Sequence, residues 1–401
     1  MLHRDRVVSA LAARREDFTR DQTMREEQIR QYLVLLDEFG GRAFEETTER
    51  LTGLDAPGAI PTEELRRGLI HRFGHVWQNA QEARHWAMNV LANVTTVAVD
   101  GSQLIPSKEY GVPIGLVQVA WFVNHHDPAK PYTKDAVVEV LSGAQLANHN
   151  EMRTVEDRLF HGEPVNQRRF ALEVEKIVES LGDLSPDKPG LVLFDGSLVA
   201  SFASQMRIES RDAYVMPLVV ALHASTSLRA PLAGYIDTTY SRDVVRMLDS
   251  LEASGSDAES GRLTFDAELF STRLDLFDRT CAFVCARGDI LERYIEPETG
   301  SDYSDQVCFT YLQAGATRPP CRVEFPRWML NENKVDVMMD IIRAEIIVGS
   351  GYPYAMEAAD AAAVLTTQDR MRFYRLFQDF AIADGLAMAT TAKMSSKHRR
   401  R

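Results

Sequence analysis

The 401-residue chain has no uninterrupted apolar run that approaches the ~20 residues of a membrane-spanning helix. Its first six residues, Met-Leu-His-Arg-Asp-Arg, also lack the apolar core of a signal peptide. We therefore expect a cytoplasmic protein with no membrane association.

Cysteine is scarce as well. The four cysteines, Cys281, Cys285, Cys308 and Cys321, lie in or near apolar runs, and their spacing matches no familiar zinc-binding pattern. In a reducing compartment such residues are expected to be buried thiols rather than disulfides.

Two further absences exclude functions. The net charge of −13 excludes a nonspecific basic coat for nucleic acid, although it leaves room for a local basic channel. No Gly-x-x-x-x-Gly-Lys-Ser/Thr loop is present, so this chain is not expected to power translocation by its own ATP hydrolysis.

The most informative feature that is present is a pair of apolar runs, each ending in Asp-Gly-Ser. They are Val97–Ser102 and Leu191–Ser197. A β-branched and aromatic run that stops at Asp-Gly is typical of a buried strand whose last side chain is a carboxylate at the sheet edge. Two neighbouring strands of this kind would bring two carboxylates together, which favours a divalent metal site over a pair of simple turns.

The order of the segments predicts that these strands are neighbours. After Asp100 come apolar runs over residues 114–123 and 136–141, whose short connections favour an antiparallel meander. A helical stretch over about 150–181 then leads to the strand that ends at Asp195. Strand, strand, strand, helix, strand is the order of an RNase H-like core, so we expect an α/β fold with such a mixed sheet flanked by helices.

The helix before Asp195 offers a third acid. Its apolar stripe leaves Glu173 and Glu175 on opposite margins, and periodicity does not distinguish between them. Arg168 and Arg169 on its first turn would contact phosphate or pair with these acids.

Other candidates lie near the C-terminus. Asp360 stands among alanines in an apolar helix, and Tyr352 precedes Pro353, a good first-turn residue. The pair His125 and His126 invites a metal-binding interpretation, but a strand-end loop is a common place for histidines, and we favour that simpler interpretation.

Taken together, these residues resemble the motifs of the NurA nucleases. The similarity covers about residues 95–385 and lies in the order of four short motifs: Asp100–Ser102, Val165–Glu173, Leu193–Leu198 and Gly351–Asp360. The resemblance implies an RNase H-like, Mn²⁺-dependent DNA nuclease, with Mg²⁺ as the alternative ion and two ions in the site. It implies 5′-to-3′ exonuclease and single-strand endonuclease activity, a homodimer, and a HerA-type hexameric ATPase as partner in DNA-end processing, repair or antiphage defence.

Carried over to this chain, the resemblance assigns the metals to Asp100, Glu173 and Asp195, with Tyr352 and Asp360 completing the site. Asp360 stands where archaeal members carry His. Asp237 stands where a family Lys is expected, so another cation, Arg242, would contact DNA phosphate together with Arg168 and Arg169.

The expected organisation has three parts. Residues 1–92 form a helical arm for dimerisation or docking, with one helix starting after an N-cap at Thr62; residues 93–388 form the nuclease domain, with a flexible insertion near 252–266; and residues 389–401 form a basic tail.

Two other functions remain open. One is an actin-like ATP-dependent phosphotransferase, which predicts two similar halves and a nucleotide-dependent thermal shift. The other is a noncatalytic scaffold for a hexameric ATPase, which predicts that loss of the aspartates changes no DNA assay.

Overall fold

The computed structural model describes residues 2–108, 112–147, 159–184, 188–252 and 264–386. The chain divides into two compact units. The first unit contains Met1–Val76, Tyr235–Glu292 and Ser304–Arg327, and the second contains Trp77–Gly234, Arg293–Tyr303 and Trp328–Arg401.

The second unit is built on a mixed sheet. Its strands are β3 (Thr95–Leu104), β4 (Gly115–Asn124), β5 (Thr133–Leu141), β6 (Gly190–Asp195) and the start of β7 (Leu232–Ile236). They lie in the order β7-β6-β3-β4-β5, in which β3, β4 and β5 form an antiparallel meander and β6 runs parallel to β3. The predicted RNase H-like order is therefore confirmed.

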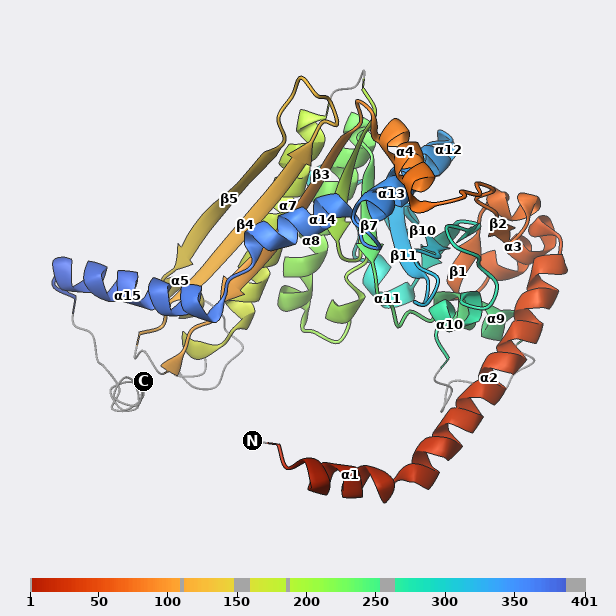
Figure 1. The fold of residues 1–401 in the computed structure, drawn as a ribbon, viewed down its shortest axis with the longest axis horizontal. Coiled ribbons are helices and arrows are strands. Elements are labelled where there is room, and N and C mark those ends of the chain that lie inside the picture. Colours follow the sequence, from red (N-terminus) through yellow and green to blue (C-terminus); the bar gives the residue numbers. More distant parts are fainter. Residues whose placement is uncertain (1, 109–111, 148–158, 185–187, 253–263, 387–401) are drawn as a thin grey trace. The chain divides into compact units, whose positions relative to one another are not determined.

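Helices cover both faces of this sheet (Figure 1). On one face, α7 (Glu163–Asp183) places Lys176 over the ring of Trp121, with 3.9 Å between Nζ and the ring centroid. On the other face, Gln118 Nε2 donates to the carbonyl oxygen of Ala363 in α14 (Tyr354–Ala363) at 3.0 Å. Because side chains alternate along a strand, odd-numbered residues of β4 face α7 and even-numbered residues face α14.

The remaining helices of the second unit surround these layers. They are α4 (Ala80–Leu91), α5 (Gly143–Ala147), η3 (Ser201–Ala203), α8 (Ile208–Leu228), α12 (Trp328–Asn331), α13 (Val335–Val348) and α15 (Thr367–Ala383). Across the described ranges, no helix combines the length and apolar character that crossing a membrane requires.

The first unit carries its own antiparallel strands. Its main strands, β1 (Gly58–Pro61), β9 (Phe283–Ala286), β10 (Val307–Leu312) and β11 (Cys321–Pro326), lie in that order, while β2 (Ile70–His71) pairs with β8 (Arg279–Thr280). Its helices are α1 (Arg4–Ala12), α2 (Arg15–Gly41), α3 (Phe44–Thr52), η1 (Glu63–Arg67), α9 (Asp243–Glu252), α10 (Asp266–Phe270) and α11 (Gly288–Leu291).

The prediction of a wholly helical segment over residues 1–92 is wrong at β1 and β2. Thr62 does not cap an α-helix: its hydroxyl donates to the carbonyl oxygen of Ala282 at 2.8 Å, and only the short 3₁₀ helix η1 follows. Pairing of Gly58–Pro61 with β9, over 200 residues later in the chain, overrides the local helical signal.

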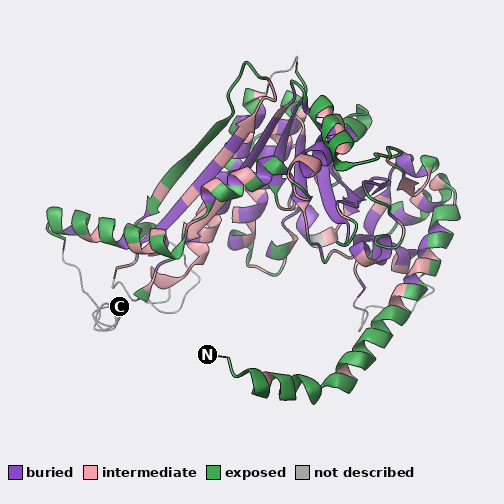
Figure 2. Ribbon diagram, in the orientation of Figure 1, coloured by how far each residue is buried: buried purple, intermediate pink, exposed green. Residues whose placement is uncertain are grey.

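The N-terminal helices match the predicted arm in part. Figure 2 shows α1 and the first turns of α2 exposed, whereas Tyr32, Leu36 and Phe39 near the end of α2 are buried. The predicted basic tail, 389–401, and residues 253–263 of the predicted insertion lie outside the described residues.

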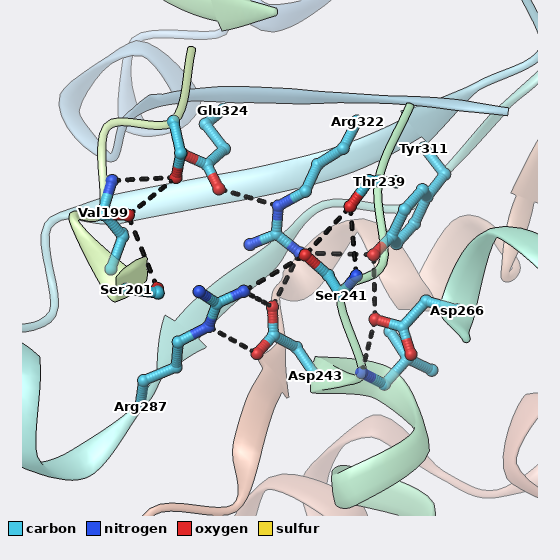
Figure 3. A network of polar contacts seen from close by, with 12 residues as sticks. Val199, Ser201, Thr239, Ser241, Asp243, Asp266, Arg287, Tyr311, Arg322 and Glu324 are labelled. Atoms are coloured by element: carbon cyan, nitrogen blue, oxygen red, sulfur yellow. Dashed lines mark hydrogen bonds and ion pairs between the residues drawn. The ribbon is translucent and has the colours of Figure 1, made fainter. Parts of the chain in front are cut away.

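The core of the first unit contains a network of charged side chains that the sequence did not reveal (Figure 3). Arg322 is 1% exposed; its Nη1 lies 2.7 Å from Asp243 Oδ2 and its Nε lies 2.7 Å from Glu324 Oε1. Arg287 completes the pairing of Asp243 through two further hydrogen bonds. The four cysteines of this unit are buried free thiols, as predicted.

Candidate active site

Two aspartates lie side by side on neighbouring parallel strands of the second unit. The register of β3 and β6 pairs Val99 with Phe194, so the next residues, Asp100 and Asp195, lie together and face the same side of the sheet. β6 ends at Asp195, as predicted. The prediction that Asp100 ends its strand is wrong: β3 continues to Leu104 because β4 pairs with it from Thr96 to Leu104.

The side chains of Tyr352 and Asp360 approach from the α14 face. The Tyr352 hydroxyl donates to Asp195 Oδ2 at 3.0 Å. Asp360 lies in α14, and its negative charge acts on Asp100. The alanine-rich helix α14 therefore brings the exposed carboxylate of Asp360 to the pair formed by Asp100 and Asp195.

Glu173 reaches the same place from the opposite face of the sheet. It lies on α7, is 4% exposed, and its carboxylate occupies the space beside Gly101 where any other residue would carry a Cβ atom. Glu175, the acid on the other margin of the apolar stripe, instead pairs with Arg168, with 2.7 Å between Glu175 Oε1 and Arg168 Nη1. Of the two acids that periodicity left equivalent, Glu173 is the one that lies near the aspartates.

Burial and the repulsion of neighbouring acids raise the pKa values of two of these carboxyl groups, Asp100 and Glu173. The pKa of Asp100 is raised to about 6, chiefly by burial and also by the charges of Asp195 and Asp360, against the backbone hydrogen bond of Gly101 and the charge of Arg169. The pKa of Glu173 is raised to about 7, chiefly by burial and also by the charges of Asp100 and Asp195, against the charge and hydrogen bond of Arg169. A cation among them would relieve both effects.

The donor set suits a hard divalent cation. All four acids offer carboxylate oxygens, the ligands that Mg²⁺ and Mn²⁺ prefer. Among the described residues, no group of three or more His, Cys, Asp or Glu side chains is arranged so that it could hold a metal ion as it stands. Arg169 hydrogen-bonds Glu173, and the oxygen ligands of the four acids fit a hard divalent cation by their chemistry.

The predicted DNA-contacting arginines have protein partners. Arg168 binds Glu139 through its Nε, at 3.0 and 2.9 Å from the two carboxylate oxygens, and also pairs with Glu175. Arg169 pairs with Glu173. Arg242 belongs to the first unit, where its Nε donates to the carbonyl oxygen of Thr264 at 3.2 Å. Their contact with DNA stays a prediction.

Two other sequence features have structural roles. His126 Nδ1 lies 2.8 Å from the carbonyl oxygen of Val94, and His125 Nδ1 lies 3.1 Å from Thr95 Oγ1. Asp237, at the position of the expected family Lys, lies 4.0 Å from Arg318.

Pairing of Arg168 and Arg169 with the acids of their own helix was one of the two interpretations offered by the sequence, and the structure contains both pairs. Sequence reasoning missed one part of this site. The need for glycine at position 101 was not readable, because it depends on how α7 packs against β3.

Comparison with known proteins gives a family and a set of structures. A family model described as the NurA domain matches residues 94–365. The NurA nuclease from Sulfolobus solfataricus is 13% identical with a TM-score of 0.47, and the match covers 72% of this chain and 85% of that one. A NurA bound to dAMP and manganese is 9% identical with a TM-score of 0.37, covering 70% and 86%. The catalytic domain of human Endonuclease V is 11% identical with a TM-score of 0.32, covering 73% and 88%. No curated protein matches the sequence.

Proposed function

The chain belongs to the NurA domain family, and from this premise we propose that it is a metal-dependent DNA nuclease, a hydrolase of phosphodiester bonds. The observation that carries the proposal is the meeting of Asp100, Asp195 and Glu173 at one place on an RNase H-like sheet, with raised pKa values for Asp100 and Glu173 that a cation would lower.

We assign the metal to Asp100, Glu173, Asp195 and Asp360, with Mn²⁺ as the first choice, Mg²⁺ as the alternative, and two ions in the site. Bound cations of this kind activate water and neutralise the charge that develops on a phosphate. Arg169 balances the charge of Glu173 and so limits repulsion among the acids. Tyr352 orients the carboxylate of Asp195 by donating a hydrogen bond to its Oδ2.

Further parts of the proposal come from the family resemblance. They are action on DNA ends and single strands with 5′-to-3′ polarity, a homodimer, and a HerA-type hexameric ATPase as partner in DNA-end processing, repair or antiphage defence. An ATPase partner also agrees with the lack of a phosphate-binding loop motif in this sequence.

The test is cleavage of end-labelled single- and double-stranded DNA with Mn²⁺, Mg²⁺ or EDTA. We expect cleavage with Mn²⁺, none with EDTA, and a loss of at least about 100-fold in Asp195→Asn, since the site would lose a charged ligand. Asp379→Asn, which changes an exposed acid on α15, is the matched control and should cleave like wild type.

The outcome that contradicts the proposal is absence of cleavage by folded wild type, even with a HerA-type partner and ATP. A thermal shift with ATP would then favour the phosphotransferase. Binding to a hexameric ATPase without any cleavage would favour the scaffold.

A further inference from the structure

The turn that presents Tyr352 is tightly wound. Between α13 and α14, Ser350 has φ of 59° and Gly351 has φ of 123°, so two successive residues adopt left-handed conformations. A Cβ atom added at Gly349 would overlap the carbonyl oxygen of Tyr352. The direction of the Tyr352 side chain therefore depends on how the two flanking helices are held.

Glu345 binds both ends of this turn. Its backbone carbonyl accepts a hydrogen bond from Gly349 N at 2.9 Å, at the end of α13. Its carboxylate Oε2 accepts one from Ala355 N at 2.9 Å, in the first turn of α14. A carboxylate at a helix N-terminus pairs with backbone N–H groups that have no helical partner.

The other carboxylate oxygen connects the turn to the strand of Asp100. Thr96, fully buried on β3, donates its hydroxyl to Glu345 Oε1 at 2.8 Å, and His126 Nε2 lies 3.6 Å from the same oxygen. Thr96 and Asp100 face the same side of β3 because they are four residues apart. One side chain, 1% exposed, thus joins α13, α14 and β3.

A buried carboxylate is a costly way to stabilise a fold. Replacing buried charged groups with apolar ones of similar volume is often neutral or stabilising. The contacts of Glu345 converge instead on the segment that directs Tyr352 toward Asp195. This pattern is expected where the position of a site residue matters more than net stability.

We infer that Glu345 is a positioning residue for the proposed active site: it holds α14 against β3 and so maintains the hydrogen bond between Tyr352 and Asp195. The inference rests on the proposed nuclease function, and it needs a measurement that does not depend on cleavage.

The kinetic experiment uses the full chain with Mn²⁺ and compares Glu345→Ala, Glu345→Gln and Asp340→Asn. Asp340, also on α13 and 2.8 Å from Arg343, is the matched control and should keep wild-type rates. We expect Glu345→Ala to lower kcat on the order of 10- to 100-fold with little change in KM, because small displacements of site residues have effects of this size. Glu345→Gln keeps an acceptor for Ala355 N and should restore most of the rate.

A double-mutant cycle distinguishes positioning from a general loss of stability. If Glu345 acts through Tyr352, then Glu345→Ala combined with Tyr352→Phe should be at most about twofold slower than the slower single variant. Effects that multiply would overturn the inference. If Glu345→Ala does not fold, Thr96→Val removes one donor to the same carboxylate at nearly constant volume and replaces it in the cycle.

Hydrogen exchange supplies the readout that is independent of cleavage. In Glu345→Ala, the amides of residues 349–352 and 354–356 should exchange at least about tenfold faster, while those of β4 and α7 stay as in wild type. Unchanged exchange at 349–356, or uniform acceleration everywhere, would contradict the inference. Should wild type fail to cleave DNA while this local effect is present, the proposed function fails and the structural role of Glu345 stands.

Discussion

At the residue scale, the absence of a side chain at position 101 decides whether Glu173 reaches the aspartates. An added Cβ at Gly101 would overlap the Glu173 carboxylate, while the backbone there is an ordinary strand. We predict that Gly101→Ala lowers Mn²⁺-dependent cleavage at least about tenfold and destabilises the protein by about 1–3 kcal/mol, as overpacking does.

Gly182→Ala is the control for that experiment. Nothing lies within 4 Å of a Cβ at this helical position, so the change should leave cleavage intact and raise stability by about 1 kcal/mol. Equal cleavage rates for Gly101→Ala and Gly182→Ala would show that cleavage does not depend on the present position of Glu173.

A second prediction at this scale concerns pH. Because the pKa of Glu173 is raised to about 7 in the folded state, the folded chain binds a proton that the unfolded chain releases above its ordinary pKa near 4.5. Stability of the metal-free protein should therefore fall as pH rises from about 4.5 to 7, by at most about 1.4 kcal/mol per pH unit from this group.

Thermal or urea unfolding in EDTA across this pH range measures the effect. Glu173→Gln should flatten the slope, and Mn²⁺ should stabilise wild type more at pH 7.5 than at pH 5.5, because protons compete with the metal for the carboxylates. If stability depends on pH equally steeply in wild type and in Glu173→Gln, then Glu173 is not the group that causes the pH dependence.

At the scale of elements, Arg322 joins β11 to α9 inside the first unit. Its guanidinium lies 3.6 Å from the centroid of the Phe309 ring and contacts Asp243 and Glu324, all buried. We predict that Arg322→Ala destabilises the protein by about 3–5 kcal/mol, because removing one partner leaves buried charge uncompensated.

Urea unfolding tests this prediction beside Arg318→Ala. The side chain of Arg318 is 58% exposed, and its Nη1 lies as far as 4.0 Å from Asp237 Oδ1. Because such an exposed ion pair is weak, loss of Arg318 should lower the free energy of unfolding by less than about 1 kcal/mol. Equal losses of unfolding free energy in Arg322→Ala and Arg318→Ala would mean that the buried network stabilises the fold no more than an exposed ion pair does.

At the scale of the whole molecule, the exposed N-terminal segment is shorter than the arm that the sequence predicted. Removing everything before residue 90 would delete β1 and β2, which belong to the sheet of the first unit. A variant lacking residues 1–22 keeps Arg25, which pairs with Glu268 at 2.5 Å, and the buried end of α2.

We predict that this shorter variant unfolds at the temperature of the full chain, because none of the residues it loses in α1 and the first turns of α2 is buried. If the arm mediates dimerisation, light scattering will show the mass fall from dimer to monomer. An unchanged mass would place the proposed dimer contact elsewhere.

The amino-acid sequence by itself determined the local patterns: apolar runs ending in Asp100 and Asp195, the strand order that makes them neighbours, and the stripe of α7 with acids at its margins. Periodicity reports which residues share a face of one element, so these predictions needed no long-range contact. Tertiary structure alone decided that β3 continues past Asp100, that Glu173 rather than Glu175 lies beside the aspartates, and that Glu345 binds Thr96, 249 residues away in sequence. Burial and charge pairing arise only when distant elements pack, and they determine which acids have raised pKa values and which side chains hold them in place.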